Sequence, residues 1–396
     1  MLRILMLAPS LDREKKGGVS GHVFNLTRWL SERPETDITL QCFGPGDSID
    51  EVNGCRVVTL RKRRIHKLLP FIPVLRIWRT VRRERPDVLH VQGSSLSYAL
   101  LYAMLLSPRR MPKVITIHGH PIEEGLIAGW LRERSLRSRL MAWAERKVPS
   151  CFDVIITVTA RLRDDLRTRY DTYARVDISV IPNGVDAEEF SMREVGSDFT
   201  LNGIGYRKDC LTILNAKALT AFNGQEFLIR AFERVASQVP DSRLLLFGTG
   251  PDLERFSKLS CDLGVSEKVH FLGHVPNELM PNALSMTDIV VIPSVRVGGV
   301  EEGSSLGLIE AMACSRAVVA SDVGGSSESI VSGENGLLVP ERNPAAIAEA
   351  ILAIHADKDL ATRLGRAARE YVLAERTWNR IATRYADAYE AARSIR

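Results

Sequence analysis

Short runs of consecutive apolar residues alternate with longer segments of helical periodicity along the whole chain. A strand that is apolar at every position is covered on both faces, which is typical of parallel sheets in α/β proteins. Right-handed crossovers between such strands predict doubly wound domains. The predicted strands are Ile4–Ala8, Ile38–Cys42, Val88–Val91, Val114–Ile117, Val154–Val158, Ile178–Ile181, Leu211–Asn215, Leu244–Phe247, Val269–Leu272, Ile289–Ile292, Ala317–Ala320 and Gly336–Val339.

The chain of 396 residues is too long for one ordinary hydrophobic core, which predicts two domains. We expect the first over residues 1–185 and the second over 210–375, joined by a polar, glycine-containing linker at 186–209. Residues 376–396 have a helical pattern, and we expect this helix to pack back toward the first domain. In two domains of this kind facing a central cleft, ligands would bind at the carboxyl ends of the strands.

Composition places the chain among globular proteins, with 45% hydrophobic and 26% charged residues. The six cysteines are scattered without a C-x-x-C pair, which fits a reducing compartment and argues against structural zinc. The first apolar run, ending before Pro9, predicts a buried strand better than a signal peptide, and no run reaches about 18 residues. We therefore expect a cytoplasmic protein, or one peripheral on the cytoplasmic face of a membrane.

Positive charge is concentrated from Arg61 to Arg85, where basic residues are interleaved with apolar ones that include Trp78. Two interpretations stay open for this segment. It could lie on an anionic membrane surface, or it could be a helix whose apolar side packs on its own domain. No nucleic-acid recognition motif accompanies the charge, so we expect no nucleic-acid partner.

Two glutamates eight positions apart mark the strongest candidate site. Glu302 falls in a loop rich in glycine and serine after an apolar strand, and Glu310 falls about one turn into a helix predicted to begin near Ser305. Ser304 and Ser305 are good N-cap residues, so free N–H groups and the positive end of the helix dipole would face the space between the carboxylates. A diphosphate flanked by hydroxyl-bearing rings, as in a nucleotide-sugar, fits that arrangement.

Eight motifs occur in order along nearly the whole chain: Gly17-Gly18-Val19, Asp87-Val-Leu-His90, Thr116-Ile-His-Gly119, Val180-Ile-Pro-Asn-Gly-Val-Asp186, Asn223-Gly224, Phe271-Leu-Gly-His-Val275, the Glu302 and Glu310 pair, and Gly324-Gly-Ser-Ser-Glu328 with Asn335-Gly-Leu-Leu-Val-Pro340. Together they resemble the retaining glycosyltransferases of the GT-B type, often called family 4. The resemblance implies two Rossmann-like doubly wound domains facing a central cleft. It also implies transfer of a hexose-type sugar, with retention, from a nucleotide-diphosphate donor, UDP- or GDP-linked, to an acceptor such as a lipid-linked or polysaccharide precursor.

The resemblance also implies roles for particular residues. Glu310 would accept hydrogen bonds from the ribose hydroxyls, and Glu302 would hold hydroxyls of the donor sugar. His118 would lie beside the sugar near the anomeric carbon. The remaining donor-site candidates are small or backbone contributors: Gly17 and Gly18 in the turn after the first strand, the main-chain N–H groups of Gly303, Ser304, Ser305 and Leu306, the loop residue Asn223, and Gly248 in a turn lining the base or phosphate pocket.

The chain departs from the family where an arginine and a lysine usually neutralise the diphosphate. Those two positions fall on Ala218 and Asn223, while Lys217 lies one residue away. A lysine lacks the bidentate fork of arginine, so the change is not neutral. Three readings stay open: Lys217 takes the cationic role, another residue such as Arg296 takes it, or the site has lost activity.

Neither a metal nor a bound cofactor is expected in the chemistry. The single Asp-x-Asp triplet, Asp357-Lys-Asp359, falls between two predicted helices, where aspartate is an ordinary cap. Gly248-Thr-Gly250 is only half of a dinucleotide fingerprint. We expect the departing phosphate, rather than an enzyme base, to take the proton of the acceptor. Two alternatives remain: an inactive glycosyltransferase-like subunit, and a nucleotide-sugar epimerase or phosphorylase of the same fold.

Overall fold

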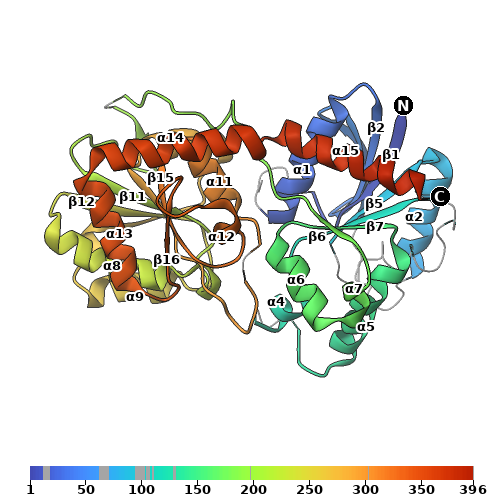
Figure 1. Cartoon of the computed structure of the whole chain (residues 1–396), viewed down its shortest axis with the longest axis horizontal. Helices are drawn as coiled ribbons and strands as arrows, with labels where there is room; N and C mark the ends of the chain where they lie inside the picture. The colour runs from blue at the N-terminus through green and yellow to red at the C-terminus, as the bar shows by residue number, and fades with distance from the viewer. Residues whose placement is uncertain are drawn as a thin grey trace. The chain divides into compact units, whose positions relative to one another are not determined.

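A computed structural model describes residues 1–11, 18–61, 71–93, 103, 108, 111–127, 131–196, 198–301 and 303–395. The chain forms two compact units (Figure 1). Unit 1 comprises Met1–Asn183 together with Trp378–Arg396, and unit 2 comprises Gly184–Thr377. The last segment of the chain therefore belongs to the same unit as the first.

Unit 1 is built on an eight-stranded sheet in the order β3-β4-β2-β1-β5-β6-β7-β8. Every neighbouring pair is parallel except β3 with β4. The strands are β1 Leu2–Leu7, β2 Thr36–Gly44, β3 Ser48–Val52, β4 Cys55–Arg61, β5 Val88–Gln92, β6 Lys113–Ile117, β7 Val154–Thr157 and β8 Ile178–Val180. The helices are α1 Gly18–Ser31, α2 Phe71–Glu84, α4 Pro121–Ile127, α5 Leu136–Cys151, α6 Ala160–Arg169, α7 Asp171–Ala174 and α15 Trp378–Ser394.

Both faces of this sheet are buried, as the continuous apolar runs predict. Ile4 and Met6 of β1 pack in a core with α1 and α15, whereas Leu5 and Leu7 pack in a second core with α2, α5 and α6. Among the buried residues of α15 is Trp378, at its first position. The terminal helix thus supplies part of the core of unit 1.

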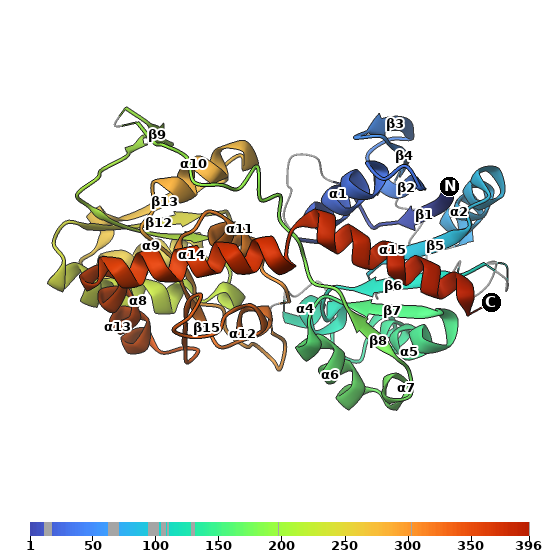
Figure 2. The same cartoon turned by 45° about the horizontal axis from the view of Figure 1, so that its top comes forward.

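Unit 2 contains a six-stranded parallel sheet in the order β13-β12-β11-β14-β15-β16. The strands are β11 Leu211–Ala216, β12 Ser242–Phe247, β13 Val269–Gly273, β14 Ile289–Ile292, β15 Ala317–Ser321 and β16 Leu337–Val339. The helices are α8 Gln225–Gln238, α9 Leu253–Asp262, α10 Met280–Ser285, α11 Leu306–Ala313, α12 Gly325–Ser329, α13 Pro344–Ala356 and α14 Lys358–Glu375. One core packs α8, α9 and α13 on the sheet, and the other packs α10, α11 and α14 on it (these helices are labelled in Figure 2).

The α/β class and the two Rossmann-like domains are therefore confirmed. Each of the twelve predicted strands is present, with ends that differ by no more than two residues. The hairpin of β3 and β4 at one edge of the sheet was not predicted (Figure 2). Its first strand is mostly exposed, so it has no apolar run. The signal that could have revealed it is Asn53-Gly54, since both residues have positive φ, 51° and 72°, as a two-residue hairpin turn requires.

Segment 186–209 packs into unit 2 and does not behave as a linker. It contains the short antiparallel pair β9 Thr200–Leu201 and β10 Ile204–Gly205. Phe190 and Leu201 are buried in the core of unit 2. The chain passes between the units at two adjacent points, because Val185 and Thr377 form a parallel bridge and the N–H of Val185 donates to the carbonyl of Arg376 at 2.8 Å.

The basic segment Arg61 to Arg85 is divided by the structure. Arg61 ends β4, residues 62–70 lie outside the described part, and most of the rest forms α2. Val74, Ile77 and Val81 of α2 are buried in the core of unit 1, which agrees with the interpretation that its apolar side packs on its own domain. The guanidinium of Arg82 lies over the ring of Trp78 at 4.2 Å. In the part of the chain that the structure describes, no helix is both long and apolar enough to span a bilayer.

Candidate functional site

The strand order of unit 2 reverses direction between β11 and β14, which lie side by side at the centre of the sheet. In doubly wound sheets the loops at the carboxyl ends of two such strands diverge and leave room for a ligand. The loop after β11 begins with Lys217, and the loop after β14 contains Ser294. The Nζ of Lys217 donates to Ser294 Oγ at 3.3 Å, so the lysine ammonium spans this switch point.

Glycines at this edge allow neighbouring loops to approach closely. Gly248 follows β12 with φ +109°, and a Cβ there would overlap the carbonyl oxygen of Lys217. Gly224 has φ +67°, and a Cβ there would overlap the carbonyl oxygen of Pro293. A backbone hydrogen bond holds the same two loops together, since the N–H of Lys217 donates to the carbonyl oxygen of Phe247 at 3.2 Å. Gly248 therefore acts here through the close backbone contact that positions Lys217.

Asn223, one of the predicted donor-binding residues, closes its own loop. Its side-chain amide donates to the carbonyl of Ala218 at 2.7 Å and to Thr220 Oγ1 at 3.2 Å. Ala218 is exposed and Lys217 is partly buried. The residues in the two usual cationic positions thus shape the loop, and the lysine beside them provides its positive charge.

Helix α11 begins at the same edge, as predicted, with Ser305 in the N-cap position. The Ser305 hydroxyl makes no capping bond, and its Oγ is buried without a hydrogen-bond partner among the described residues. A Cβ added to Gly307 would lie 3.3 Å from the carbonyl oxygen of Ala216, so the first turn of α11 lies against the end of β11. The free N–H groups of that turn, beginning at Leu306, are therefore close to the switch point. Just before the helix, the Gly303 carbonyl accepts from the N–H of Gly325 at 3.2 Å.

Glu310 is the fifth residue of α11 and is partly buried. Burial raises the pKa of its carboxyl to about 7, with a further contribution from the negative charge of Glu189. Glu189 lies in the turn after the first passage between units, where Asp186 Oδ1 accepts from its N–H at 3.1 Å. Sequence reasoning did not identify Glu189, because nothing local relates it to a helix more than a hundred residues away.

Arg296, the alternative phosphate cation, has an acidic partner. Its guanidinium Nε donates to Glu301 Oε1 at 2.8 Å, and its backbone N–H donates to Glu341 Oε2 at 2.7 Å. The second oxygen of Glu301 accepts from the N–H of Gly324 at 2.8 Å. These contacts hold the Arg296 charge against a carboxylate, which favours Lys217 for the role.

His118 in unit 1 follows β6, and its Nε2 lies 2.7 Å from Gln92 Oε1. An amide oxygen only accepts, so in this orientation Nε2 of His118 carries the proton and Nδ1 is left as an acceptor. The Nε2 of buried Gln92 lies 3.4 Å from His90 Nε2. Burial lowers the pKa of His118 well below its usual value, so its ring is neutral at physiological pH.

A buried polar network extends from these histidines to the terminal helix. Nδ1 of His90 lies 2.8 Å from the Tyr389 hydroxyl, and the Tyr385 hydroxyl lies 3.3 Å from His22 Nε2. His22 Nδ1 lies 2.8 Å from Asn183 Oδ1, and its ring meets that of His118 edge-on with centroids 4.7 Å apart. Burial lowers the pKa of His22 to about 4 and that of His90 to about 3, so both rings are also neutral. His90 therefore has structural hydrogen bonds on both ring nitrogens.

The candidates divide between the two units and the undescribed residues. Lys217, Asn223, Gly248 and the start of α11 meet at one edge of unit 2. His118 and Gly18 belong to unit 1, where Gly18 has φ +59° and begins α1. Gly17 and Glu302 lie outside the described residues. Asp357 caps α14 by accepting from the N–H of Leu360 at 2.9 Å, as expected for an ordinary cap.

Comparison with known proteins identifies the class. Residues 202–371 match the family described as Glycosyl transferases group 1, and residues 16–189 match Glycosyltransferase Family 4. An uncharacterised glycosyltransferase of Methanocaldococcus jannaschii is 30% identical over 286 residues, 72% of this chain and 70% of that protein. A GDP-mannose-dependent alpha-(1-6)-phosphatidylinositol monomannoside mannosyltransferase of Mycolicibacterium smegmatis is 29% identical over 314 residues, 77% of this chain and 76% of that protein.

Solved structures give the same fold. Sucrose-phosphate synthase from Thermosynechococcus elongatus matches with a TM-score of 0.78 and 21% identity, covering 100% of both chains. Two Rossmann-like units in one chain, each with its own switch point, form the GT-B fold. Within that class, this chain belongs to the group 1, family 4 glycosyltransferases, and the resemblance read from its motifs is confirmed.

Proposed function

We propose that the protein transfers a hexose from a nucleotide-diphosphate donor to a lipid-linked acceptor, with retention at the anomeric carbon and without a metal ion. The observation that carries the proposal is the placement of Lys217 across the β11–β14 switch point, next to the first turn of α11. A lysine ammonium and a helix N-terminus at one place form a site for a diphosphate.

In the proposed reaction the bond between the sugar C1 and the phosphate oxygen breaks, and a bond from C1 to the acceptor oxygen forms on the same face. The acceptor proton passes to the departing phosphate oxygen, so no enzyme base is needed. Lys217 and the N–H groups of α11 stabilise the negative charge that develops on that phosphate. Neutral His118, its Nδ1 available as an acceptor, is proposed to contact the sugar. Glu302 is proposed from the sequence alone to hold the sugar hydroxyls.

The nature of the acceptor is supported by two observations. The mannosyltransferase relative acts, by its name, on a phosphatidylinositol monomannoside. On this chain α2 leaves Arg79, Arg82 and Arg83 exposed, while its apolar side is buried in unit 1. We propose that these arginines attract an anionic membrane surface electrostatically rather than by insertion, so binding to anionic liposomes should weaken as salt rises.

The proposal is tested by nucleotide release from GDP-mannose and from UDP-, ADP- and dTDP-sugars, with and without a membrane lipid extract and with EDTA present. We expect release from one donor, stimulated by lipid and unaffected by EDTA. The product of an α-linked donor should have an α linkage by NMR. Release that stops with EDTA would contradict the metal-free reaction, and a β-linked product would contradict retention.

One observation favours a second candidate, an inactive glycosyltransferase-like subunit. Both positions at which the family resemblance implies cations have uncharged residues, and the side-chain amide of Asn223 donates its hydrogen bonds within its own loop. The same donor panel separates the two. No nucleotide release from any donor, together with no change in thermal stability on adding any nucleotide, would favour the inactive subunit.

Donor binding should depend on pH through Glu310. Its pKa is raised to about 7, so the carboxyl is largely protonated at pH 6 and ionised at pH 8. The ionised form accepts hydrogen bonds from the ribose hydroxyls more strongly than the protonated form does. The donor KM should therefore fall about fivefold over that range, the difference between charged and neutral acceptors. Steady-state kinetics from pH 5.5 to 8.5 measure this change.

Two variants at this site check the assignment. Glu310→Gln should raise the donor KM and abolish its pH dependence. Glu189→Gln removes the like charge that adds to the effect of burial on the Glu310 pKa. The midpoint of the change in donor KM with pH should therefore move to lower pH. An unchanged pH profile in Glu310→Gln would show that another group titrates.

A further inference from the structure

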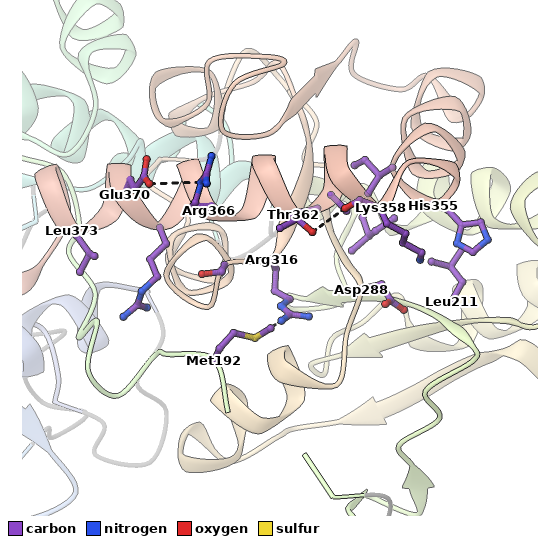
Figure 3. A pocket seen from close by; sticks show the side chains of 16 residues that line it. Met192, Leu211, Asp288, Arg316, His355, Lys358, Thr362, Arg366, Glu370 and Leu373 are labelled. Atoms are coloured by element: carbon purple, nitrogen blue, oxygen red, sulfur yellow. Dashed lines mark hydrogen bonds and ion pairs between the residues drawn. The ribbon is translucent and has the colours of Figure 1, made fainter. Parts of the chain in front are cut away.

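Unit 2 has a cavity at the opposite edge of its sheet from Lys217. This cavity, of about 430 Å³, lies at the amino ends of the strands, since Leu211, Ile289 and Ala317 on its wall are the first residues of β11, β14 and β15. The end of α13 and one side of α14 complete it (Figure 3). Its volume is within the range of small-molecule sites in proteins. The proposed transfer reaction makes no use of it.

Positive charge predominates around this cavity. Arg316, Arg369 and Lys358 line it without an ion-pair partner among the described residues, whereas the other lining arginine, Arg366, pairs with Glu370 at 3.9 Å (Figure 3). Asp288 is the remaining carboxylate on the wall. Three cations against one carboxylate leave the cavity electropositive.

The hydrogen bonds described for the two arginines end on neutral groups, and the carboxylate of Asp288 also attracts Arg316. Arg316 donates to the carbonyls of Thr287 and Cys314, and Arg369 donates to those of Ala187, Phe190 and Ala313. Carbonyl oxygens orient a guanidinium but do not neutralise it. Each guanidinium has five N–H donors, so some remain after these bonds. Asp288 offsets only part of the positive charge of the lining, so these partly buried guanidinium groups can still bind an anion.

The other end of the cavity supplies Lys358 and His355, which face it together (Figure 3). Lys358 begins α14 and is exposed, so its ammonium can move toward a ligand. Nδ1 of His355 is buried and has no hydrogen-bond partner in the described structure.

We propose that this cavity is a second ligand site, specific for a small organic phosphate monoester. The phosphate would bind Lys358 and Arg316, and the organic part would lie on the apolar wall formed by Leu211, Ile289 and Ala317. The site borders both passages between the units. Arg369 bonds to Ala187 and Phe190 just after the first passage, and α14 ends just before the second. Its position is that of an effector site rather than of a second donor site.

Phenyl phosphate is a suitable probe, since phenol and inorganic phosphate represent its two halves. Isothermal titration should show that phenyl phosphate binds at least tenfold more tightly than either half. Lys358→Glu should weaken this binding at least tenfold, whereas Lys258→Glu, which changes an exposed lysine on α9, should leave it unchanged. Arg316→Lys, which keeps the charge but loses carbonyl bonds, should weaken it less than Lys358→Glu.

The diphosphate site is the competing location for the probe. Binding that persists in Lys217→Ala and in saturating nucleotide would place the probe at the amino edge. Binding lost in Lys217→Ala, or equal in Lys358→Glu and Lys258→Glu, would overturn the proposal, as would no binding at all. Because nucleotide release is measured separately, failure of this site and failure of the proposed transfer are distinguishable.

Discussion

Lys217→Ala should lower kcat/KM for sugar transfer by about 100-fold or more, the effect of removing one donor that stabilises developing charge. The reason is specific to this chain. Ala218 and Asn223 occupy the positions at which the family resemblance implies cations, and Arg296 is paired with Glu301. Lys217, whose Nζ donates to Ser294 Oγ at 3.3 Å, is therefore the cation that we propose for the diphosphate. Initial-rate kinetics with the donor identified in the panel measure the loss.

Two further variants make this result interpretable. Lys217→Arg keeps the charge, so it should retain much more activity than Lys217→Ala, although its planar fork differs in shape. Lys258→Ala removes an exposed lysine elsewhere in unit 2 and should have no effect. Full activity in Lys217→Ala would assign the phosphate to another group and remove the central support for the mechanism.

Gly224→Ala should destabilise unit 2 by roughly 3 kcal/mol. A side chain at φ +67° costs about 1 kcal/mol, and overpacking against the Pro293 carbonyl adds about 2 kcal/mol. Because Pro293 precedes Ser294, relief of the overlap should also displace the hydroxyl that contacts Lys217. Urea unfolding followed by circular dichroism measures the loss, and donor binding should weaken with it.

Gly264→Ala is the matched control for that substitution. Gly264 has φ +70°, nearly the same as Gly224, but nothing lies within 4 Å of the position of an added Cβ. It follows α9, and its N–H donates to the Cys261 carbonyl at 2.9 Å. Its replacement should cost only about 1 kcal/mol, the backbone contribution alone. Equal losses in the two variants would show that the approach of Gly224 to Pro293 is unimportant.

The features that were predictable from sequence depend on local patterns of apolar and polar residues. Continuous apolar runs located the strands of both sheets, and helical periodicity located α15 with Tyr385 and Tyr389 buried. Glu310 falls one turn into α11 because Ser305 is a good N-cap residue and the residues after it, apart from Gly307, favour a helix. The hairpin of β3 and β4 was not predicted because β3 is mostly exposed to water and has no run of apolar residues.

The features that were not predictable depend on contacts between distant segments. The effect of Glu189 on the pKa of Glu310, the pairing of Arg296 with Glu301, and the bonding of Gln92 to His118 each require the fold to be known. The unused hydroxyl of Ser305 is another case, since its residue type predicts a capping bond that the structure lacks. Segment 186–209 has a polar composition typical of a linker, but Phe190 and Leu201 anchor it in a core.

The split composition of unit 1 has a consequence for the order of folding during synthesis. Residues 184–377 form unit 2 without a break, whereas unit 1 is incomplete until α15 is made. Domains generally fold in the order in which the ribosome releases them. Here the first 183 residues emerge without the helix that covers Ile4, Met6 and the hydrogen-bonding histidines His22 and His90. Unit 2 can therefore reach its final state before unit 1, because one apolar face of the unit 1 sheet is covered by α15 only after α15 has emerged from the ribosome.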